Sequence, residues 1–414
     1  MNSALDHKAL AELLTRPRLR RLLEVLNADG EETRIVGGAV RNALLGREVT
    51  EVDLASTAAP DVTTRRTEQA GFKAVPTGIE HGTVTIIVDG EPFEVTTLRE
   101  DVETDGRYAI VCFGNDFKAD AFRRDFTINA LSIGIDGALY DYTDGEADLA
   151  AGRVRFIGDA HARIREDFLR ILRFFRFHAE YAKGEPDREG LLAASTERAG
   201  LERLSRERVR NEILKLLKAR RALETLAVFS EYGFLPLLLG GVAELGRFAR
   251  VAESGLADPA AGRLAALTVM TEDDAERLRE RLRLSNEEQA SLATYGRLLA
   301  RLKTMPDPID ALAMRRLAAD HPVAILSLVF TATAGEPSPL VQDEARALLG
   351  RYARGEETLP VFPLRGADLI AHKIPPGPKL GELLGLARQA WLERGCPQDE
   401  ASARALLQLA LEAT

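Results

Sequence analysis

The sequence predicts an α+β protein whose strands are concentrated in its first part and whose remainder is helical. Between residue 33 and about residue 157, strand-like runs such as GTVTIIVDG (82–90) and PFEVTTL (92–98) are separated by Gly and Asp turns. Beyond that point the apolar residues recur with a helical period, and strand-like runs nearly vanish. Breaks rich in Pro and Gly cut the second part into helices of ordinary length, with domain boundaries expected near residues 225 and 335.

Composition indicates an ordinary globular protein. The 414 residues are 45% hydrophobic and 29% charged, which suits roughly two to four domains. Cys112 and Cys396 are too few for a disulfide framework, and this favours a reducing compartment. The sequence shows neither an apolar run of membrane-spanning length nor a signal-like start, so we predict a cytoplasmic protein that does not enter a membrane.

Charge is distributed unevenly along the chain. The formal net charge of −9 argues against a general nucleic-acid coat. Residues 203–221, however, hold eight Lys or Arg against two Glu. A local basic strip of this kind can still bind phosphates.

A pair of carboxylates alternates with apolar residues in the run TEVDLAST (50–57). If this run is a strand, Glu51 and Asp53 project from one face while Val52 and Leu54 point the other way. Two anions this close favour a cation between them, and Mg²⁺ is the usual occupant of an all-oxygen site. A solvated edge strand is the alternative, because such pairs are common on exposed strands.

Two glycines precede the acidic pair. Gly37 and Gly38 end a predicted strand and precede the helical spacing of AVRNALLG (39–46), so we expect their N–H groups at a helix N-terminus, where anions bind. Alone, a Gly-Gly pair is more often a turn. A third carboxylate, Glu94, lies between apolar residues of a later strand. Amides that hold a triphosphate and carboxylates that hold two Mg²⁺ ions are what two-metal phosphoryl transfer requires.

This order of motifs resembles the DNA polymerase β nucleotidyltransferase superfamily. Four later stretches bring the resemblance closer to class II tRNA nucleotidyltransferases, the CCA-adding enzymes and their bacterial poly(A) polymerase relatives: RRDFTINAL (123–131), DYTDGEADLAAGRVRFIGD (141–159), REDFLRILRFFRF (165–177) and LSRERVRNEILKLL (204–217). The resemblance covers about residues 30–220. It implies a nucleotidyltransferase-fold head with a mixed sheet at 1–155, a base-selecting helical neck at 156–225, a helical body at 226–335 and a tRNA-binding helical tail at 336–414.

By this resemblance, EDFLR (166–170) is the family's base-selecting motif. Asp167 and Arg170 are i and i+3, and on one helix they would be neighbours. A carboxylate accepts and a guanidinium donates hydrogen bonds, which matches the edges of cytosine and adenine but leaves uracil and guanine unpaired. In isolation the same spacing is more often a surface ion pair.

The resemblance implies further contacts with the nucleotide. Asp125 and a neighbouring arginine, Arg124, are expected to contact the ribose 2′-hydroxyl and the triphosphate, and Arg173 is expected to bind the nucleotide as well. Arg41 is expected either at the triphosphate or in a structural contact, with ion pairing as an equal alternative. Asn129 is expected to cap or orient this segment.

The basic strip contains Arg206, Arg208 and Arg210. These residues are expected either to bind RNA or to brace the base-selecting helix, and bracing is the preferred role. Aromatic residues at helical spacing are more often core than base-stacking platforms, and this applies to Phe174, Phe175 and Phe177. By resemblance, Asp105 and Arg107 belong to a mobile loop that helps the change from C to A addition, and His81 has a structural role.

The implied activity is template-independent addition of C, C and A to the 3′ end of tRNA from CTP and ATP. Glu51, Asp53 and Glu94 would be catalytic, with Glu51 and Asp53 holding Mg²⁺. Poly(A) polymerase and A-only or CC-only enzymes are alternatives, although PTGIEHGTVTI (76–86), in place of a G-R-R-F-like stretch, favours tRNA repair. An RNA-binding protein with weakened catalysis is an alternative of a different class, because Glu51 stands where most relatives of the resembled family have Asp.

Overall fold

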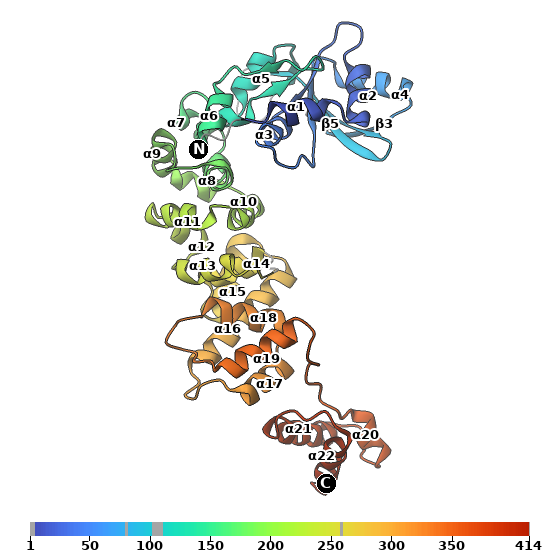
Figure 1. Cartoon of the computed structure of the whole chain (residues 1–414), viewed down its shortest axis with the longest axis vertical. Helices are drawn as coiled ribbons and strands as arrows, with labels where there is room; N and C mark the ends of the chain where they lie inside the picture. The colour runs from blue at the N-terminus through green and yellow to red at the C-terminus, as the bar shows by residue number, and fades with distance from the viewer. Residues whose placement is uncertain (1–4, 79–81, 102–110, 257–259, 414) are drawn as a thin grey trace. The chain divides into compact units, whose positions relative to one another are not determined.

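The chain folds into two compact units, Met1–Thr225 and Leu226–Thr414. This computed structural model describes residues 5–78, 82–101, 111–256 and 260–413. Within these ranges every strand lies in the first unit, drawn blue to green in Figure 1, and the second unit is helical. The predicted α+β fold with an all-α C-terminal part is confirmed, while the boundaries at residues 155 and 335 stay predictions.

The first unit contains the sheet and the helices that surround it. Its strands are β1 (Thr33–Val36), β2 (Asp53–Ser56), β3 (Lys73–Gly78), β4 (Thr83–Val88), β5 (Glu91–Thr97), β6 (Arg99–Asp101), β7 (Val111–Phe113), β8 (Ser132–Ile133) and β9 (Leu139–Tyr140). Its helices are α1 (His7–Leu14), α2 (Pro17–Leu26), α3 (Gly38–Leu44), α4 (Pro60–Gln69), α5 (Phe117–Arg123), η2 (Thr127–Asn129), α6 (Gly145–Ala151), α7 (Ala160–Glu166), α8 (Leu169–Tyr181), α9 (Arg188–Thr196), η3 (Arg198–Arg203) and α10 (Arg206–Lys218), and α11 (Ala222–Glu231) continues into the second unit.

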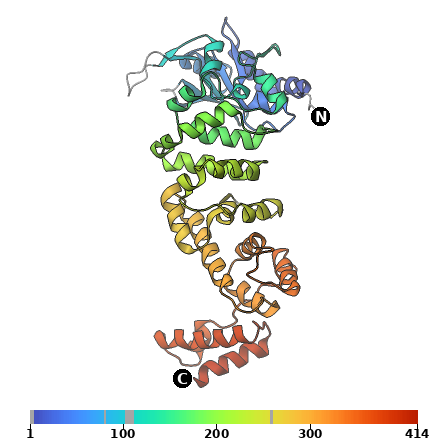
Figure 2. The ribbon, with the colours of Figure 1, turned by 90° about the vertical axis from the view of Figure 1, so that its left-hand side faces the viewer.

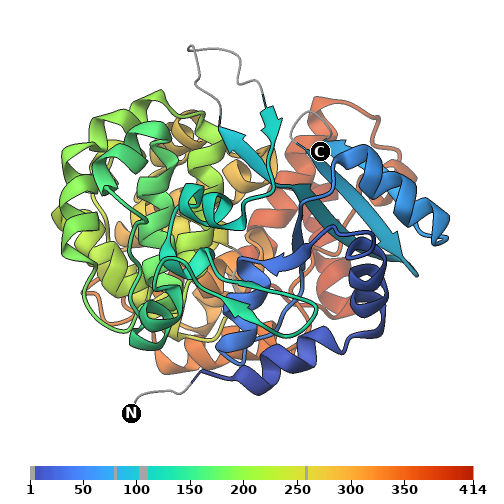
Figure 3. The same ribbon diagram turned by 90° about the horizontal axis from the view of Figure 1, so that it is seen from above.

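The main sheet has seven strands in the order β3-β4-β5-β2-β1-β8-β9. Strands β2 and β5 are parallel, and the other neighbouring pairs are antiparallel. Alternation explains β4, because Val84, Ile86 and Val88 are buried while the residues between them are half-buried. Helices α2 and α4 pack against each other and against β4 (Figure 3).

Strand β2 begins later than the sequence pattern predicts. Its first residue is Asp53, so Glu51 lies in the segment before the strand, and the prediction that both carboxylates alternate within one strand was wrong for Glu51. The parallel register places Asp53 beside Glu94 on β5, and the antiparallel register places it opposite Val36, the last residue of β1. The acidic residues and the Gly37 turn are thereby brought to one end of the central strands.

An aromatic cluster joins the segment after α5 to helix α8. The ring centroids of Phe126 and Phe156 are 4.9 Å apart, and Phe174 stacks on Phe156 at 5.4 Å. Phe174 and Phe175 are fully buried and Phe177 nearly so, which confirms that these side chains belong to the core. Helix α8 is therefore held against the head by apolar packing.

The second unit consists of helices over its described residues. They are α12 (Phe234–Leu239), α13 (Leu245–Glu253), α14 (Ala260–Thr268), α15 (Glu272–Leu282), α16 (Asn286–Lys303), α17 (Ala311–Asp320), α18 (Val323–Ala332), α19 (Asp343–Ala353), α20 (Gly366–Ala371), α21 (Pro378–Glu393) and α22 (Glu400–Glu412). Near the C-terminus, α21 and α22 lie side by side (Figure 2), and Trp391 and Leu406 are buried between the last helices. Ser285 and Glu288 form a capping box that starts α16.

Replacing Gly145 by Ala should destabilise the protein at the joint between α6 and η2. A Cβ at this position would lie 2.3 Å from the carbonyl oxygen of Thr127, which is backbone and cannot move aside like a side chain. Overpacking of this kind costs about 1–3 kcal/mol. Urea unfolding of Gly145→Ala measures it. Gly184→Ala is the control, since a Cβ there meets no atom within 4 Å; equal losses in both variants would contradict the prediction.

Candidate active site

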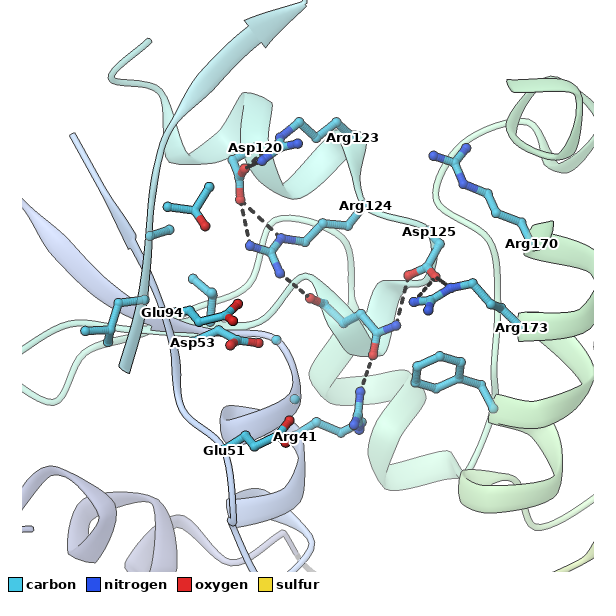
Figure 4. Close-up of a pocket in the computed structure, with 18 of the residues that line it drawn as sticks. Arg41, Glu51, Asp53, Glu94, Asp120, Arg123, Arg124, Asp125, Arg170 and Arg173 are labelled. Atoms are coloured by element: carbon cyan, nitrogen blue, oxygen red, sulfur yellow. Dashed lines mark hydrogen bonds and ion pairs between the residues drawn. The ribbon is translucent and has the colours of Figure 1, made fainter. Parts of the chain in front are cut away.

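A pocket of about 720 Å³ in the first unit collects the predicted catalytic and nucleotide-binding residues (Figure 4). One wall comes from the sheet and α3, and the other from α5, the segment after it and α8. The predicted residues that line it are Gly37, Gly38, Arg41, Glu51, Asp53, Glu94, Arg124, Asp125, Asp167, Arg170 and Arg173. Residues more than 100 positions apart are thus brought to one site.

The acidic side of the pocket is built on the parallel pair β2 and β5. Figure 4 shows the Asp53 and Glu94 side chains close together, with Glu51 apart from them on the segment that leads into β2. Within the described residues, no group of three or more His, Cys, Asp or Glu side chains is arranged to hold a metal ion. The compact part of the acidic side is therefore the pair Asp53 and Glu94.

Asp53 carries the electrostatic cost of this arrangement. Its side chain is accessible at the pocket surface, but protein atoms displace part of its water. This partial burial raises the pKa of Asp53, and the charges of Glu94 and Glu51 raise it further, whereas Arg124 acts in the opposite direction. Carboxylates held together against repulsion in this way form a site that a cation would stabilise.

The basic side of the pocket depends on a residue that the motif analysis missed. Asp120 is 3% exposed, and its carboxylate accepts from Arg123 Nε at 2.7 Å and from Arg124 Nη2 at 2.9 Å. Burial alone would raise the pKa of Asp120, but the two guanidinium groups hold it below its usual value. The i,i+3 and i,i+4 spacing to the arginines was the available signal.

Asn129 contacts three other residues that line the pocket. Its Oδ1 accepts from Arg41, its Nδ2 donates to Asp125 at 2.9 Å, and its backbone carbonyl accepts from Arg124 at 3.3 Å. The amide of Asn129 offers an acceptor for a guanidinium and, on a separate atom, a donor for a carboxylate. The prediction that Asn129 orients this segment agrees with these contacts.

Arg41 lines the pocket but is almost fully buried. Its Nη2 donates to the Tyr181 hydroxyl at 2.9 Å, while its buried Nε has no hydrogen-bond partner among the described residues. Its guanidinium also lies over the rings of Tyr181 and Phe177. Burial lowers the pKa of Arg41, although Tyr181 and Asp125 act in the opposite direction. These contacts are structural, one of the two roles expected for Arg41.

The glycine pair does not provide both amides to the pocket. Gly37 has φ +64°, and its N–H donates to the carbonyl of Leu131 at 3.0 Å, so the prediction that this amide is available to an anion was wrong. Glycine is nevertheless favoured here, because side chains rarely adopt this positive φ, and a Cβ would also lie 3.0 Å from Arg124 Nη1. Gly38 starts α3 and lines the pocket.

Asp125 is buried and fully engaged. Its Oδ2 accepts from Arg173 at 2.6 Å, and its Oδ1 accepts from Asn129 and from the backbone N–H of Phe126. Burial would raise the pKa of Asp125, but Arg173 and these hydrogen bonds keep it below the ordinary value. The carboxylate is therefore ionised and held in one orientation.

Asp167 and Arg170 are not i,i+3 neighbours on one helix, and that prediction was wrong. Asp167 ends α7 with extended backbone, at φ −153° and ψ 107°, and α8 begins only at Leu169. Both side chains still line the pocket. Asp167 Oδ2 accepts from Arg208 at 2.7 Å, and Arg170 Nη1 donates to Glu166 at 2.6 Å.

The basic strip lies on α10, outside the pocket lining. Arg208 contacts Asp167, as a bracing residue would, whereas Arg206 is exposed at the start of the helix and Arg210 is half-buried. Roles for Arg206 and Arg210 stay predictions. His81, Asp105 and Arg107, singled out in the sequence, lie outside the described residues.

Sequence reasoning also missed several side chains that shape the site. Arg163 and Tyr181 contact pocket residues but carry no motif signal, and Glu212, within the motif at 204–217, was given no role although it accepts from Arg176. Over the described residues, no helix is both long and apolar enough to cross a membrane.

Comparison with known proteins supplies the family. Residues 33–155 match the family described as "Poly A polymerase head domain". The chain is 36% identical over 384 residues to "CCA tRNA nucleotidyltransferase 1, mitochondrial" of Mus musculus, covering 91% of this chain and 86% of that protein. It is 32% identical over 383 residues to the "CCA-adding enzyme" of Levilactobacillus brevis, covering 88% and 91%. The solved Bacillus stearothermophilus CCA-adding enzyme in complex with CTP shares the fold, with a TM-score of 0.72, 24% identity and coverage of 96% and 99%.

The head fold and the pocket, with paired carboxylates opposite buried arginine contacts, define a nucleotidyltransferase. Identity to the mouse and bacterial proteins extends over most of the chain, and the chain belongs to the family of CCA-adding tRNA nucleotidyltransferases. The relatives include a mitochondrial protein, so membership does not assign a compartment.

Replacing Asp53 by Asn should raise the unfolding temperature of the metal-free protein at pH 7. The folded-state pKa of Asp53 is raised, so its ionised form opposes folding. This cost is absent below the unfolded-state pKa and appears as the pH rises through the folded-state pKa. Thermal unfolding in a chelator from pH 4 to 8 checks the sign, and the difference from wild type should shrink towards acid pH.

Added MgCl₂ should raise the unfolding temperature of the wild type more than that of Asp53→Asn, because the ion neutralises the carboxylate pair. Asp307→Asn, an exposed loop change in the second unit, is the control. In the pH series without metal, the assigned sign of the pKa shift would be contradicted if the wild type were no more stable than Asp53→Asn at pH 4 but more stable than it at pH 8.

Proposed function

We propose that this protein adds C, C and A to the 3′ end of tRNA, using CTP and ATP without a nucleic-acid template. One observation carries the proposal: the carboxylates of Asp53 and Glu94, the arginines beside Asp120 and the pair Asp167 and Arg170 line one pocket. Relatives named as CCA-adding enzymes match over most of the chain. One neighbour of known structure was solved in complex with CTP, which supports CTP as a substrate of this fold.

The carboxylates fit Mg²⁺ by the chemistry of their donors. Mg²⁺ prefers oxygen ligands and is commonly bound by one or two carboxylates together with substrate phosphates. Asp53 and Glu94 supply such a pair, and Glu51 lines the same pocket. Bound divalent ions would supply activation of the tRNA 3′-hydroxyl and stabilisation of the leaving pyrophosphate, as two-metal transfer requires.

The arginines orient the triphosphate and ribose. Asp120 holds Arg123 and Arg124 partly exposed in the pocket, where their positive charge attracts phosphate oxygens. The orientation of Asp125 is set by Arg173 and Asn129. Both Asp125 oxygens already accept hydrogen bonds, so a ribose 2′-hydroxyl would share an oxygen with one of these donors.

Base selection belongs to Asp167 and Arg170. Each carboxylate oxygen offers two lone pairs. Asp167 Oδ1 accepts from Leu169 N–H and Oδ2 from Arg208, which leaves one direction on each oxygen for the amino group of cytosine or adenine. Arg170 is held through Nη1, and its guanidinium donates towards the ring nitrogen. Arg208 therefore braces the acceptor half of the pair.

Poly(A) synthesis is the alternative activity, because the family that matches the head is described by that activity. The test uses purified protein, Mg²⁺ and tRNA transcripts that lack CCA, CA or A, with each labelled nucleotide in turn. Addition of C, C and A followed by a stop supports the proposal. Repeated A addition selects poly(A) synthesis, and tRNA binding without incorporation selects an RNA-binding protein. Cytoplasmic location stays a prediction from the sequence.

Asp53→Ala should abolish nucleotide incorporation. Asp53 starts β2 beside Glu94, and its loss removes half of the compact carboxylate pair. A loss of several kcal/mol of transition-state stabilisation corresponds to a fall in kcat of about 10³-fold or more. Single-turnover incorporation of labelled CTP measures it. Asp307→Ala is the control, and a fall in kcat below about tenfold for Asp53→Ala would contradict its assigned role.

Glu51→Asp should keep or raise the rate of incorporation. Glu51 precedes β2 and stands apart from the Asp53 and Glu94 pair, so its longer side chain has backbone that can adjust. By the resemblance to class II tRNA nucleotidyltransferases, aspartate is the residue that most of them carry at this position. The same single-turnover assay applies, and a fall of about tenfold would show that this site is built for glutamate.

A further inference from the structure

Arg163 connects two segments of the site without lining the pocket. It lies on α7, and its side chain is 12% exposed. Its Nη2 donates to the backbone carbonyls of Arg123 and Arg124, the latter at 2.6 Å. Its Nη1 forms an ion pair with Glu166. One guanidinium therefore reaches the triphosphate and ribose segment from the helix that precedes the base-selecting pair.

The base-selecting arginine depends on the same contacts. Arg170 Nη1 donates to Glu166 Oε2 at 2.6 Å and to the backbone carbonyl of Arg163 at 2.7 Å. Arg163 and Arg170 thus share one carboxylate oxygen of Glu166. Loss of the Arg163 side chain would therefore remove one of the two guanidinium groups that hold the Glu166 carboxylate in place for Arg170.

We propose that Arg163 is a positioning residue that sets the distance between the base-reading pair and the segment that binds ribose and triphosphate. This inference rests on the proposed function and extends it to the origin of specificity. Figure 4 shows the two segments as neighbours on one wall of the pocket, with Arg124 and Asp125 after α5 and Arg170 on α8. The planar fork of arginine is suited to this cross-link, since it directs several N–H donors at once, whereas a lysine ammonium acts as a point charge.

A cross-link of this kind makes a distinctive prediction about specificity. A side chain that merely stabilises the fold lowers the amount of active enzyme equally for every nucleotide. A residue that sets the spacing between base and sugar contacts affects the choice of base and the choice of sugar together. A misplacement of about 1 Å can cost about 10²-fold in rate.

The test compares Arg163→Ala and Arg163→Lys with wild type on tRNA that lacks CCA. Two ratios of kcat/KM are measured, CTP against UTP and CTP against dCTP. Ratios from one preparation cancel any inactive fraction. We expect both ratios to fall about tenfold or more in Arg163→Ala and by less in Arg163→Lys. Arg165→Ala is the matched control, because Arg165 lies on the same helix, is 63% exposed and pairs with Glu197; its ratios should stay within about twofold of wild type.

The outcomes separate the positioning role from the other possibilities. Unchanged ratios in Arg163→Ala overturn the proposal even if the overall rate falls, because the role is then structural. A fall in the base ratio alone also overturns it, because the sugar segment is then independent of Arg163. If Arg163→Ala does not fold, Arg163→Lys carries the test by the same criterion. Absence of incorporation by the wild type overturns the proposed function itself.

Discussion

The parallel pairing of β2 with β5 is the constraint on which the active site depends. It places Asp53 directly beside Glu94, although the two residues are 41 positions apart and like-charged. Burial and repulsion raise the pKa of Asp53, so the ligand-free site holds unfavourable electrostatic energy. The sheet can hold the two carboxylates together against this repulsion, because most residues after Asp53 in β2 and after Glu94 in β5 are buried and continue the parallel pairing of the two strands. A rigid backbone thus presents two carboxylates that a divalent cation can neutralise.

The opposite wall of the pocket holds several positively charged side chains, which repel one another as the carboxylates do. Arg123, Arg124 and Arg173 lie on this wall, and each is held by a carboxylate that is itself buried. Asp120 holds Arg123 and Arg124, and Asp125 holds Arg173. Asn129 joins these groups to Arg41 through an amide that both donates and accepts. The geometry of the arginines is thereby set before a nucleotide arrives, which is the electrostatic preorganisation that catalysis of charge transfer requires.

Sequence motifs correctly predicted which residues come together in one pocket. Each catalytic and nucleotide-binding residue predicted from the ordered motifs lines the same pocket. Sequence reasoning failed where local backbone conformation decided the outcome. Asp167 has extended backbone between two helices, so its i,i+3 spacing to Arg170 does not place the two on one helical face. Gly37 uses its N–H to join the sheet, and Glu51 lies before the strand that its alternation suggested.

The amino-acid sequence by itself determined the α+β architecture and the change to helices after the head, and its motifs named residues that line the pocket, because periodicity, glycine positions and charge type are local properties. Only the tertiary structure decided which acceptor holds which arginine. Asp120, Arg163 and Tyr181 resemble ordinary surface residues in the sequence, yet each forms contacts that bridge elements or fix a neighbouring guanidinium. Such partnerships depend on distances between segments that are far apart in the chain, and these distances exist only after the sheet and helices have packed.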